Sequence, residues 1–312
     1  MVTPLQPRVS THHWALSAAS ETQNLGGRRV TGSLYAWMLT EDFDHQHYAY
    51  EMSLEYDGVD DQRGDDIISG LLRELGHYDH DDATRLFPQL VSAVARDHLM
   101  YGRCTFELFE DADSGTPGPR LGVLPGWSLK HRRGGTFQAA PRAGKLEWRQ
   151  LPATALIEFL LPARLGKELY RTRKHLQVLD AHRPGDPAML AKAQFTGYDF
   201  DTHRNWLDEM AARTTKSIGW DGRGGFMGRA TNSYRIYRQL RFRRTWLTVV
   251  SATIETLNRI GNHPGVNSGT PLKVRVIGLP TIDQLERQMA AVVNGTESLD
   301  DIFHNVLHPR RT

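Results

Sequence analysis

One long segment with helical periodicity constrains the fold more than any other part of the sequence. Between residues 234 and 260, apolar side chains recur every three or four positions, which is the spacing of one face of an α-helix. A continuous helix of this length would span roughly 40 Å. We expect its first half to face the surface or a polyanion and its nearly uncharged second half to be buried. The first half carries five arginines: Arg235, Arg238, Arg241, Arg243 and Arg244.

Shorter helical and extended patterns accompany this segment. Helical spacing predicts further helices at residues 67–75, 86–101, 165–181, 203–217 and 281–307. Extended fragments with turn signals between 105 and 161, and again at 272–277, predict strands. Residues 33–56 fit either a strand or an irregular helix. We therefore predict an α+β fold with long helices around a small β-rich block.

Helix start signals refine these boundaries. Pro88 fits the first turn of a helix, where its missing N–H costs nothing. Thr281 with Gln284, and Ser298 with Asp301, have the spacing of capping boxes. Two short amphipathic helices are therefore expected to end the chain.

The patterns divide the chain into four segments. They are an N-terminal arm and acidic region at 1–82, a helix with a β-rich block at 83–164, helices and a loop at 165–232, and a long helix, a strand and two C-terminal helices at 233–312.

Composition excludes several classes of protein. The chain is 39% hydrophobic and 24% charged, close to the globular average and unlike a disordered or collagen-like protein. Cys104 is the single cysteine, which excludes an internal disulfide and a multi-cysteine zinc site. No apolar run approaches the roughly 20 residues of a membrane span, and the first residues lack the apolar core of a signal peptide. We expect a soluble protein made in a reducing cytoplasm.

Charge is segregated along the chain although the net charge is only +2. Residues 41–82 contain 14 Asp or Glu and two Arg, whereas residues 83–312 contain 33 Lys or Arg and 21 Asp or Glu. Such polarity suggests two faces with different partners, one of them a polyanion. The alternative is that the two signs neutralise each other within the fold or between subunits.

Two basic surfaces are candidates for contact with nucleic acid or with another subunit. The arginines of 235–244 have aromatic neighbours, and guanidinium groups pair with phosphates while rings stack on bases. Lys167, Arg171 and Lys174 form a second stripe at helical spacing. No base-reading motif accompanies either surface, so any DNA contact would be with the backbone and independent of sequence. The alternative for the arginine cluster is a solvated helix end with its aromatic rings turned into the core.

Histidine and aspartate clusters at 42–47 and 77–82 raise a different possibility. His45 and His47 would share a face if their segment were a strand, and such a pair can bind a metal. Asp79 and His80 would complete a site for a metal-dependent hydrolase. The alternative is a solvated acidic surface. Nucleotide-binding and hydrolase motifs are absent from the sequence, and a helix-turn-helix at 281–307 carries few basic residues on its second helix.

The order of several features resembles that of bacteriophage portal proteins. A helix ends at Tyr101-Gly102, a strand follows at 105–109, and a Leu121–Pro125 segment comes after an acidic turn with Gly115. The run TNSYRIYR at 231–238 leads into the long helix, as in the core of that family. The endings GLPT at 278–281 and NGTES at 294–298 are also similar. The resemblance covers residues 84–305 loosely and depends on the shared order of the motifs.

This resemblance implies a structural protein of the virion with no catalytic activity and no cofactor. Its subunits would form a homo-oligomeric ring, usually dodecameric, at one capsid vertex, assembled in the host cytoplasm. Double-stranded DNA would pass non-specifically through the channel, and the partners would be terminase, the major capsid protein and a head–tail adaptor, with no membrane. Segment 83–164 would be wing-like, helix 165–181 a stem, 184–187 a clip and helix 234–260 part of the core. Portal proteins are usually longer, so the stem and clip would be abbreviated or differently built here.

Overall fold

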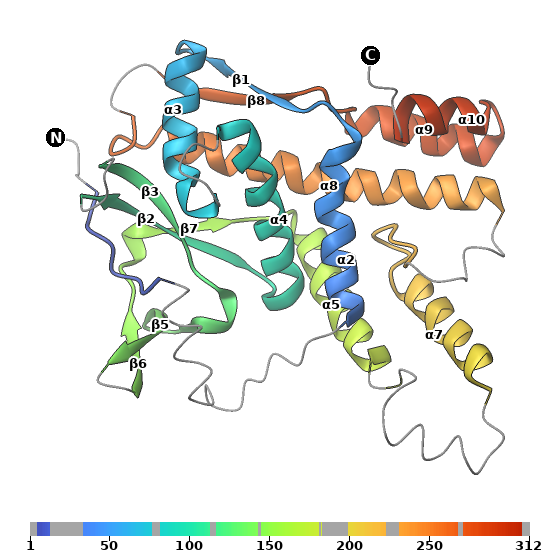
Figure 1. Cartoon of the computed structure of the whole chain (residues 1–312), viewed down its shortest axis with the longest axis horizontal. Coiled ribbons are helices and arrows are strands. Elements are labelled where there is room, and N and C mark those ends of the chain that lie inside the picture. The colour runs from blue at the N-terminus through green and yellow to red at the C-terminus, as the bar shows by residue number, and fades with distance from the viewer. Residues whose placement is uncertain are drawn as a thin grey trace. The chain divides into compact units, whose positions relative to one another are not determined.

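The fold is described here from a computed structural model, which confirms the predicted α+β class (Figure 1). The chain divides into two compact units, each built from separate segments. Unit 1 comprises residues 1–31, 52–161 and 251–277, and unit 2 comprises 32–51, 162–250 and 278–312. The four-segment division made from sequence stays a prediction. The residues described are 5–12, 34–76, 82–112, 117–142, 145–180, 182, 199–222, 231–267 and 271–307.

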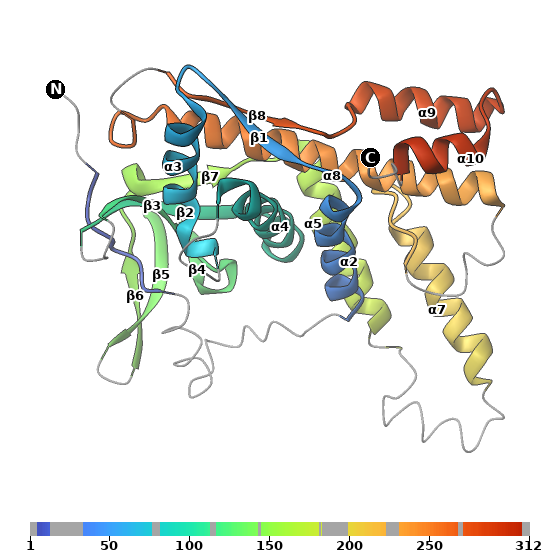
Figure 2. The ribbon, with the colours of Figure 1, turned by 45° about the horizontal axis from the view of Figure 1, so that its top comes forward.

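Unit 1 contains a three-stranded antiparallel sheet covered by a helix. The strand order is β3-β2-β7, and β2 is buried over its first six residues. Helix α4 lies against this sheet in two views (Figures 1 and 2). Asp82 caps its start by accepting from the Arg85 amide at 2.8 Å, and Gly102 ends it in the left-handed conformation at φ 79°. The elements are α4 Ala83–Tyr101, β2 Cys104–Asp111, β3 Gly118–Val123 and β7 Leu156–Phe159.

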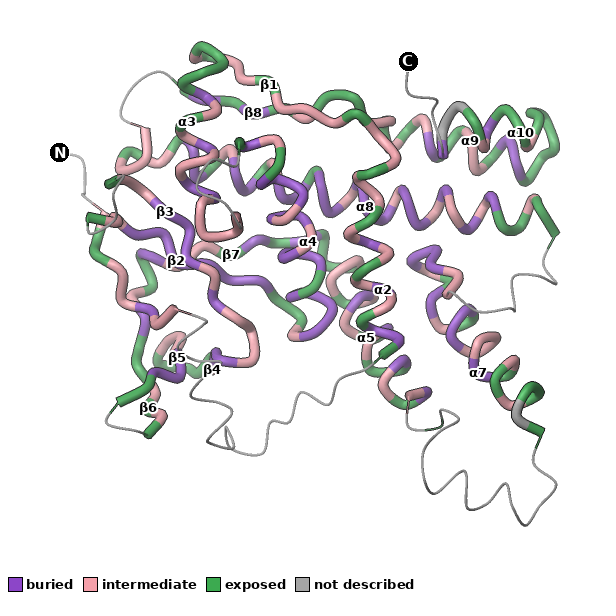
Figure 3. Tube along the Cα trace, viewed as in Figure 1, coloured by how far each residue is buried: buried purple, intermediate pink, exposed green. Residues whose placement is uncertain are grey.

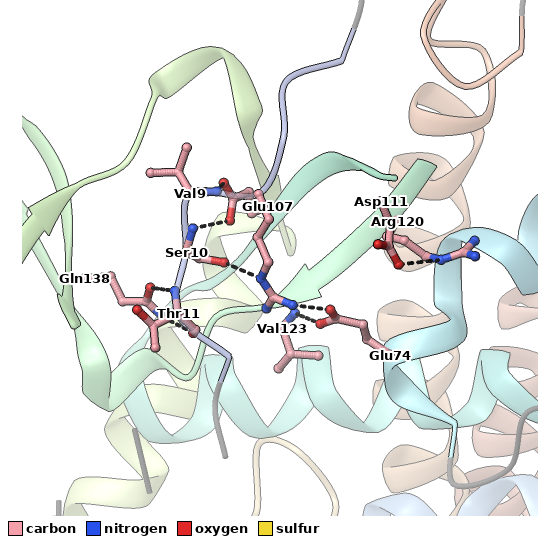
Figure 4. A network of polar contacts seen from close by, with 10 residues as sticks. Val9, Ser10, Thr11, Glu74, Glu107, Asp111, Arg120, Val123 and Gln138 are labelled. Atoms are coloured by element: carbon pink, nitrogen blue, oxygen red, sulfur yellow. Dashed lines mark hydrogen bonds and ion pairs between the residues drawn. The ribbon is translucent and has the colours of Figure 1, made fainter. Parts of the chain in front are cut away.

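A second antiparallel sheet in unit 1 has the order β4-β5-β6. Its strands are β4 Leu129–Arg132, β5 Gly135–Arg142 and β6 Lys145–Gln150. The N-terminal segment 5–12 contacts both sheets (Figure 4). Pro7 forms a parallel bridge with Glu110 of β2, and the Val9 and Thr11 amides donate to Glu107 and Gln138. The segment thereby links the two sheets of unit 1.

A two-stranded ribbon, β1 Ser53–Asp57 with β8 Lys273–Ile277, completes the strands of unit 1. The second edge of β8 is paired with two asparagine side chains from helix α8 Asn232–Gly261. The side-chain amide of Asn258 bonds both backbone groups of Val274, at 3.1 and 2.6 Å, and that of Asn262 does the same for Leu272, the residue before β8. Residues four apart on a helix are about 6.0 Å apart along its axis, and alternate strand residues are about 6.7 Å apart. The two asparagines therefore act as a substitute strand.

Unit 2 is helical in the part of the chain described. Helix α5 packs against α2 and α7, and α8 contributes its residues up to Val250 to this unit. Thr281 caps α9 by accepting from the Gln284 amide at 3.1 Å, as the capping-box pattern predicts. The elements besides α8 are α2 Leu34–Asp44, α5 Ala163–Asp180, α7 Phe200–Thr214, α9 Ile282–Asn294, α10 Leu299–Ile302 and the π-helical turn Phe303–Leu307.

Some boundaries differ from the sequence-based expectations. Residues 33–56 contain both α2 and β1, separated by a 3₁₀ turn at His45–Ala49. The helix expected at 67–75 begins earlier, as α3 Asp61–Leu72 with a 3₁₀ turn Arg73–Leu75, because Asp60 caps it. Pro88 lies in the second turn of α4 rather than the first, because the helix is capped by Asp82 and begins at Ala83, earlier in the sequence than expected. The Ser298 side chain makes no capping bond. No helix in the described ranges is long and apolar enough to cross a membrane.

A buried acid in α4 gives a prediction for unit 1. Burial raises the pKa of Asp97 to about 7, although Arg96 opposes the shift. In an unfolded chain the pKa is about 3.9, so between about pH 4 and pH 7 the folded protein holds a proton that the unfolded chain releases, and the free energy of unfolding falls as pH rises.

We expect Asp97→Asn to remove this fall in the free energy of unfolding with rising pH, because the asparagine amide cannot ionise. Urea unfolding should show the variant gaining stability over the parent from near zero at pH 4 to a few kcal/mol, as an order of magnitude, at pH 8. A difference that stays constant over this range would contradict the prediction.

Candidate nucleic-acid and subunit contact surfaces

Helix α5 presents its predicted basic stripe to solvent. Lys167, Arg171 and Lys174 are all exposed, and Arg164 extends the stripe by one turn. The opposite side is buried through Leu169, Thr172, Leu176 and Leu179. Figure 3 shows this alternation along the tube of α5. Because the apolar side packs against α2 and α7, the cations are directed outward.

The stripe has only weak internal partners in the described part of the chain. Arg164 lies 3.4 Å from Glu168, an exposed i,i+4 pair of the kind that contributes little. The Lys174 ammonium lies 4.6 Å from the centre of the Tyr170 ring. These contacts leave the charges accessible to an anion.

The arginines of α8 behave differently, and Arg238 is the clearest case. It is 1% exposed and lies inside unit 2. Its Nη2 donates to the Ala212 carbonyl at 3.0 Å, to the Thr215 hydroxyl at 3.3 Å and to the Trp220 carbonyl. Helix carbonyls near a C-terminus lack partners within the helix, so Arg238 caps the end of α7. Burial lowers the pKa of its guanidinium, and neighbouring Tyr234 opposes this shift.

The turn after α7 is fitted closely to α8. The Arg241 Nε donates to the Ser217 carbonyl at 2.8 Å, and the Thr245 hydroxyl donates to the Ile218 carbonyl at 2.9 Å. Gly219 adopts φ 87°, and a Cβ there would lie 2.2 Å from the Phe242 amide nitrogen. Only glycine fits this position, because both its backbone conformation and the close approach of the helix exclude a side chain.

Arg243 is also a structural residue, 5% exposed. It donates to the Gln46 carbonyl at 2.7 Å and to the Leu307 carbonyl at 3.2 Å. Its guanidinium lies 4.6 Å from the centre of the Tyr50 ring. Burial lowers the pKa of Arg243, and Tyr50 opposes this shift. Arg243 thus joins the 3₁₀ turn after α2 to the end of the π-helical turn Phe303–Leu307.

These positions correct the sequence-based set of contact residues. Arg238 and Arg243 are buried on carbonyl oxygens, so they leave the candidate surface. Arg241 is half-buried and donates to the Ser217 carbonyl. Arg244 is half-exposed, with its Nη2 2.6 Å from Glu286. Arg235, in the first turn of α8, is exposed. The residues that stay accessible as predicted are Lys167, Arg171, Lys174 and Arg235.

The structure also shows a basic surface that the sequence reasoning missed, on the sheet β4-β5-β6. Its single acid, Glu147, pairs with Arg142 at 3.2 Å, and Lys130 lies 3.6 Å from the centre of the Trp148 ring. A count of charges over 129–150 would have found it. Six cations are present, all but the first exposed: Lys130, Arg132, Arg133, Arg142, Lys145 and Arg149.

The histidines proposed as metal ligands lie on a helical turn rather than a strand. Within the 3₁₀ turn His45–Ala49, side chains two positions apart are rotated by about 240° around the helix axis. His45 and His47 therefore do not share a face, contrary to the expectation for a strand. Both rings lie against Tyr48, at centroid distances of 5.8 and 3.9 Å. Asp79 and His80, and the expected clip at 184–187, lie outside the described residues. Among the residues whose positions are described, no group of three or more His, Cys, Asp or Glu is placed to hold a metal ion.

Comparison with known proteins leaves the family open. No protein-family model matches the sequence, and a search of curated proteins finds no significant match.

Two arginines on the same helix test the structural role assigned to Arg238. We expect Arg238→Met to lower the free energy of unfolding of unit 2 by roughly 2–4 kcal/mol, because several buried acceptors lose their donor. The matched variant Arg235→Met removes an exposed charge and should change stability by no more than about 0.5 kcal/mol.

Chemical unfolding followed by tryptophan fluorescence measures both changes, since Trp220 and Trp246 are buried in unit 2. Equal effects of the two substitutions would contradict the assignment.

Proposed function

We propose that the protein is a ring-forming structural subunit of the portal type, with double-stranded DNA passing through the ring during packaging and ejection. The observation that carries the proposal is the outward stripe of α5, with four exposed cations at helical spacing. The motif order that resembles portal proteins gives this stripe its context. The terminase, the capsid vertex and the head–tail junction are the partners that the resemblance implies, and the virion is the expected location.

A row of exposed cations on one helix suits a sliding contact. DNA carries one negative charge per about 1.7 Å of its axis, so an exposed helix that presents a cation every turn finds a phosphate at any register. Such contacts hold the backbone without reading the bases. Each contact contributes a salt-dependent increment, with a slope of about −0.9 in log K against log salt. A few contacts per subunit give attraction without a fixed position, which a translocation channel requires.

The charge distribution also suits a ring. Contacts around a ring are heterologous, so each interface joins two different surfaces of the same chain. The acidic region contributes exposed carboxylates in unit 1, for example Glu55, Asp60 and Asp66. The sheet β4-β5-β6 contributes exposed cations. Complementary surfaces of this kind favour association in one orientation.

Large apolar side chains at the surface are a further feature expected of a subunit. Contiguous apolar surface marks sites of protein association, whereas single exposed residues need no explanation. In unit 2, Trp37 is 51% exposed, Val178 61% and Val293 71%. Val178 lies one turn beyond Lys174 on the outer side of α5, so part of this helix combines apolar and basic surface.

The assembly state tests the first half of the proposal. Mass photometry of the full-length chain should show a closed oligomer of many subunits, in keeping with a dodecameric ring. A protein that stays monomeric at micromolar concentration and across a range of salt concentrations would refute it.

The DNA contact is tested by removing the charges of α5. Lys167→Gln, Arg171→Gln and Lys174→Gln together should weaken binding of a random-sequence duplex and reduce the magnitude of the salt slope by up to about 0.9 per lost contact. Fluorescence anisotropy at several salt concentrations measures both quantities.

A matched control removes the same number of exposed charges outside both basic surfaces, with Lys216→Gln, Lys273→Gln and Arg287→Gln. This control should bind DNA as the parent does. Equal losses in the two triple variants would contradict the assignment of DNA to α5.

A further inference from the structure

Unit 1 contains a built site for an extended peptide segment, and the N-terminal residues 5–12 fill it. Glu107 of β2 is 0% exposed, and its two carboxylate oxygens accept from the Val9 and Ser10 amides, each at 2.9 Å. The Gln138 side chain accepts from the Thr11 amide at 2.7 Å and donates to the Thr11 carbonyl at 3.1 Å. Figure 4 shows these residues around the segment. The site therefore holds the backbone of its occupant.

Side-chain contacts add to this recognition. Arg149 of β6 donates to the Val9 carbonyl at 3.1 Å, and the Val9 side chain packs against an apolar cluster of Leu124, Leu129 and Leu151. Arg8 forms an ion pair with Glu74. The contacts thus come from the 3₁₀ turn Arg73–Leu75 after α3, from β2 and from the sheet β4-β5-β6.

The site is incomplete without an occupant. An empty site would leave the buried Glu107 carboxylate without the two amides that satisfy it, and an unpaired buried charge is strongly unfavourable. It would also uncover the apolar cluster. Unit 1 consequently requires a segment of this kind to be bound at all times.

The connection of segment 5–12 to the rest of the chain differs from the other connections between the units. At 51–52, 161–162, 250–251 and 277–278 the chain passes from one unit to the other within or directly between described segments. Segment 5–12 is joined to α2 through the 21 residues 13–33. The stretch of chain between segment 5–12 and α2 is therefore longer than at the other four connections.

The connection is long enough to reach a neighbouring copy. Twenty-two residue steps span at most about 75 Å. Neighbouring copies are spaced by about one subunit diameter, which is about 50 Å for a compact chain of this length. The equivalent site on an adjacent subunit of a ring is therefore within reach.

We propose that in the assembled protein the segment 5–12 of each subunit occupies the Glu107 site of the next copy. The contacts within the site are the same in either arrangement, so exchange costs little, and the ring supplies a high local concentration of donor segments. A closed cycle of exchanged segments would link every subunit to the next. This inference rests on the proposed ring, and it adds the element that joins the subunits.

The test is a pair of cysteines that a short bismaleimide can bridge. Thr11→Cys and Gln138→Cys place one thiol on the segment and one in the site. The native Cys104 is 1% exposed, so the folded protein shields it from the reagent. After the native assembly is treated, a denaturing gel should show a ladder of covalently linked subunits. A single band of monomer carrying an internal bridge would overturn the proposal. Failure of the pair to react would overturn the placement of the segment itself.

A second version uses two differently tagged chains, one with Thr11→Cys and the other with Gln138→Cys, produced together. Only exchange between copies can give a covalent heterodimer, and each variant alone is the control. Mass photometry of the same samples separates the two levels of the argument. Rings with internal bridges refute the exchange and leave the proposed function standing, whereas exchanged dimers without rings refute the function and support the exchange.

Discussion

The fold depends on pairing backbone groups that no regular helix or strand can pair, and α8 supplies many of the partners. An unpaired buried donor or acceptor costs about 1–3 kcal/mol. A polar side chain can remove this cost where a buried helix end or strand edge leaves backbone groups unpaired. Arg238 and Arg243 meet this need in unit 2 by binding carbonyl oxygens. Asn258 and Asn262 meet it in unit 1 along β8. One helix thus carries two kinds of polar side chain, each matched to the backbone it faces.

The sequence predicted the helices well because their signals are local. The periodic segment 234–260 corresponds to α8 Asn232–Gly261, and the Thr281 cap of α9 lies where the pattern predicts it. The two-stranded ribbon was harder to predict, since residue 53 pairs with residue 277. An aromatic-rich stretch such as 33–56 is ambiguous until that distant partner is known. The bounds of strand β4 are hard to predict for a similar reason, because only its pairing with β5 distinguishes it from a loop.

The candidate site was only partly predictable, and the arginines explain why. A helical row of arginines has the same spacing whether it faces solvent or buried carbonyls. The acceptors of Arg243 are 197 and 64 residues away in sequence, so no local pattern reports them. The aromatic neighbours that suggested base stacking have the same ambiguity: Phe242 and Trp246 are buried, and Trp246 stacks near Tyr50. The alternative of rings turned into the core is the one that the structure supports for these two residues.

The contrast between α5 and α8 also bears on how a ring subunit can hold DNA loosely. An arginine fixed on two carbonyls cannot move to follow a phosphate, and its charge is committed to the fold. In the proposed ring, the lysines and arginines on the outer side of α5 would keep their rotational freedom, so each would bind a passing phosphate only briefly and weakly. A ring of such helices would attract the duplex through many transient contacts. The rigid interactions would then be reserved for the subunits themselves, where the buried Glu107 carboxylate and its two amide donors offer a contact that does not slide.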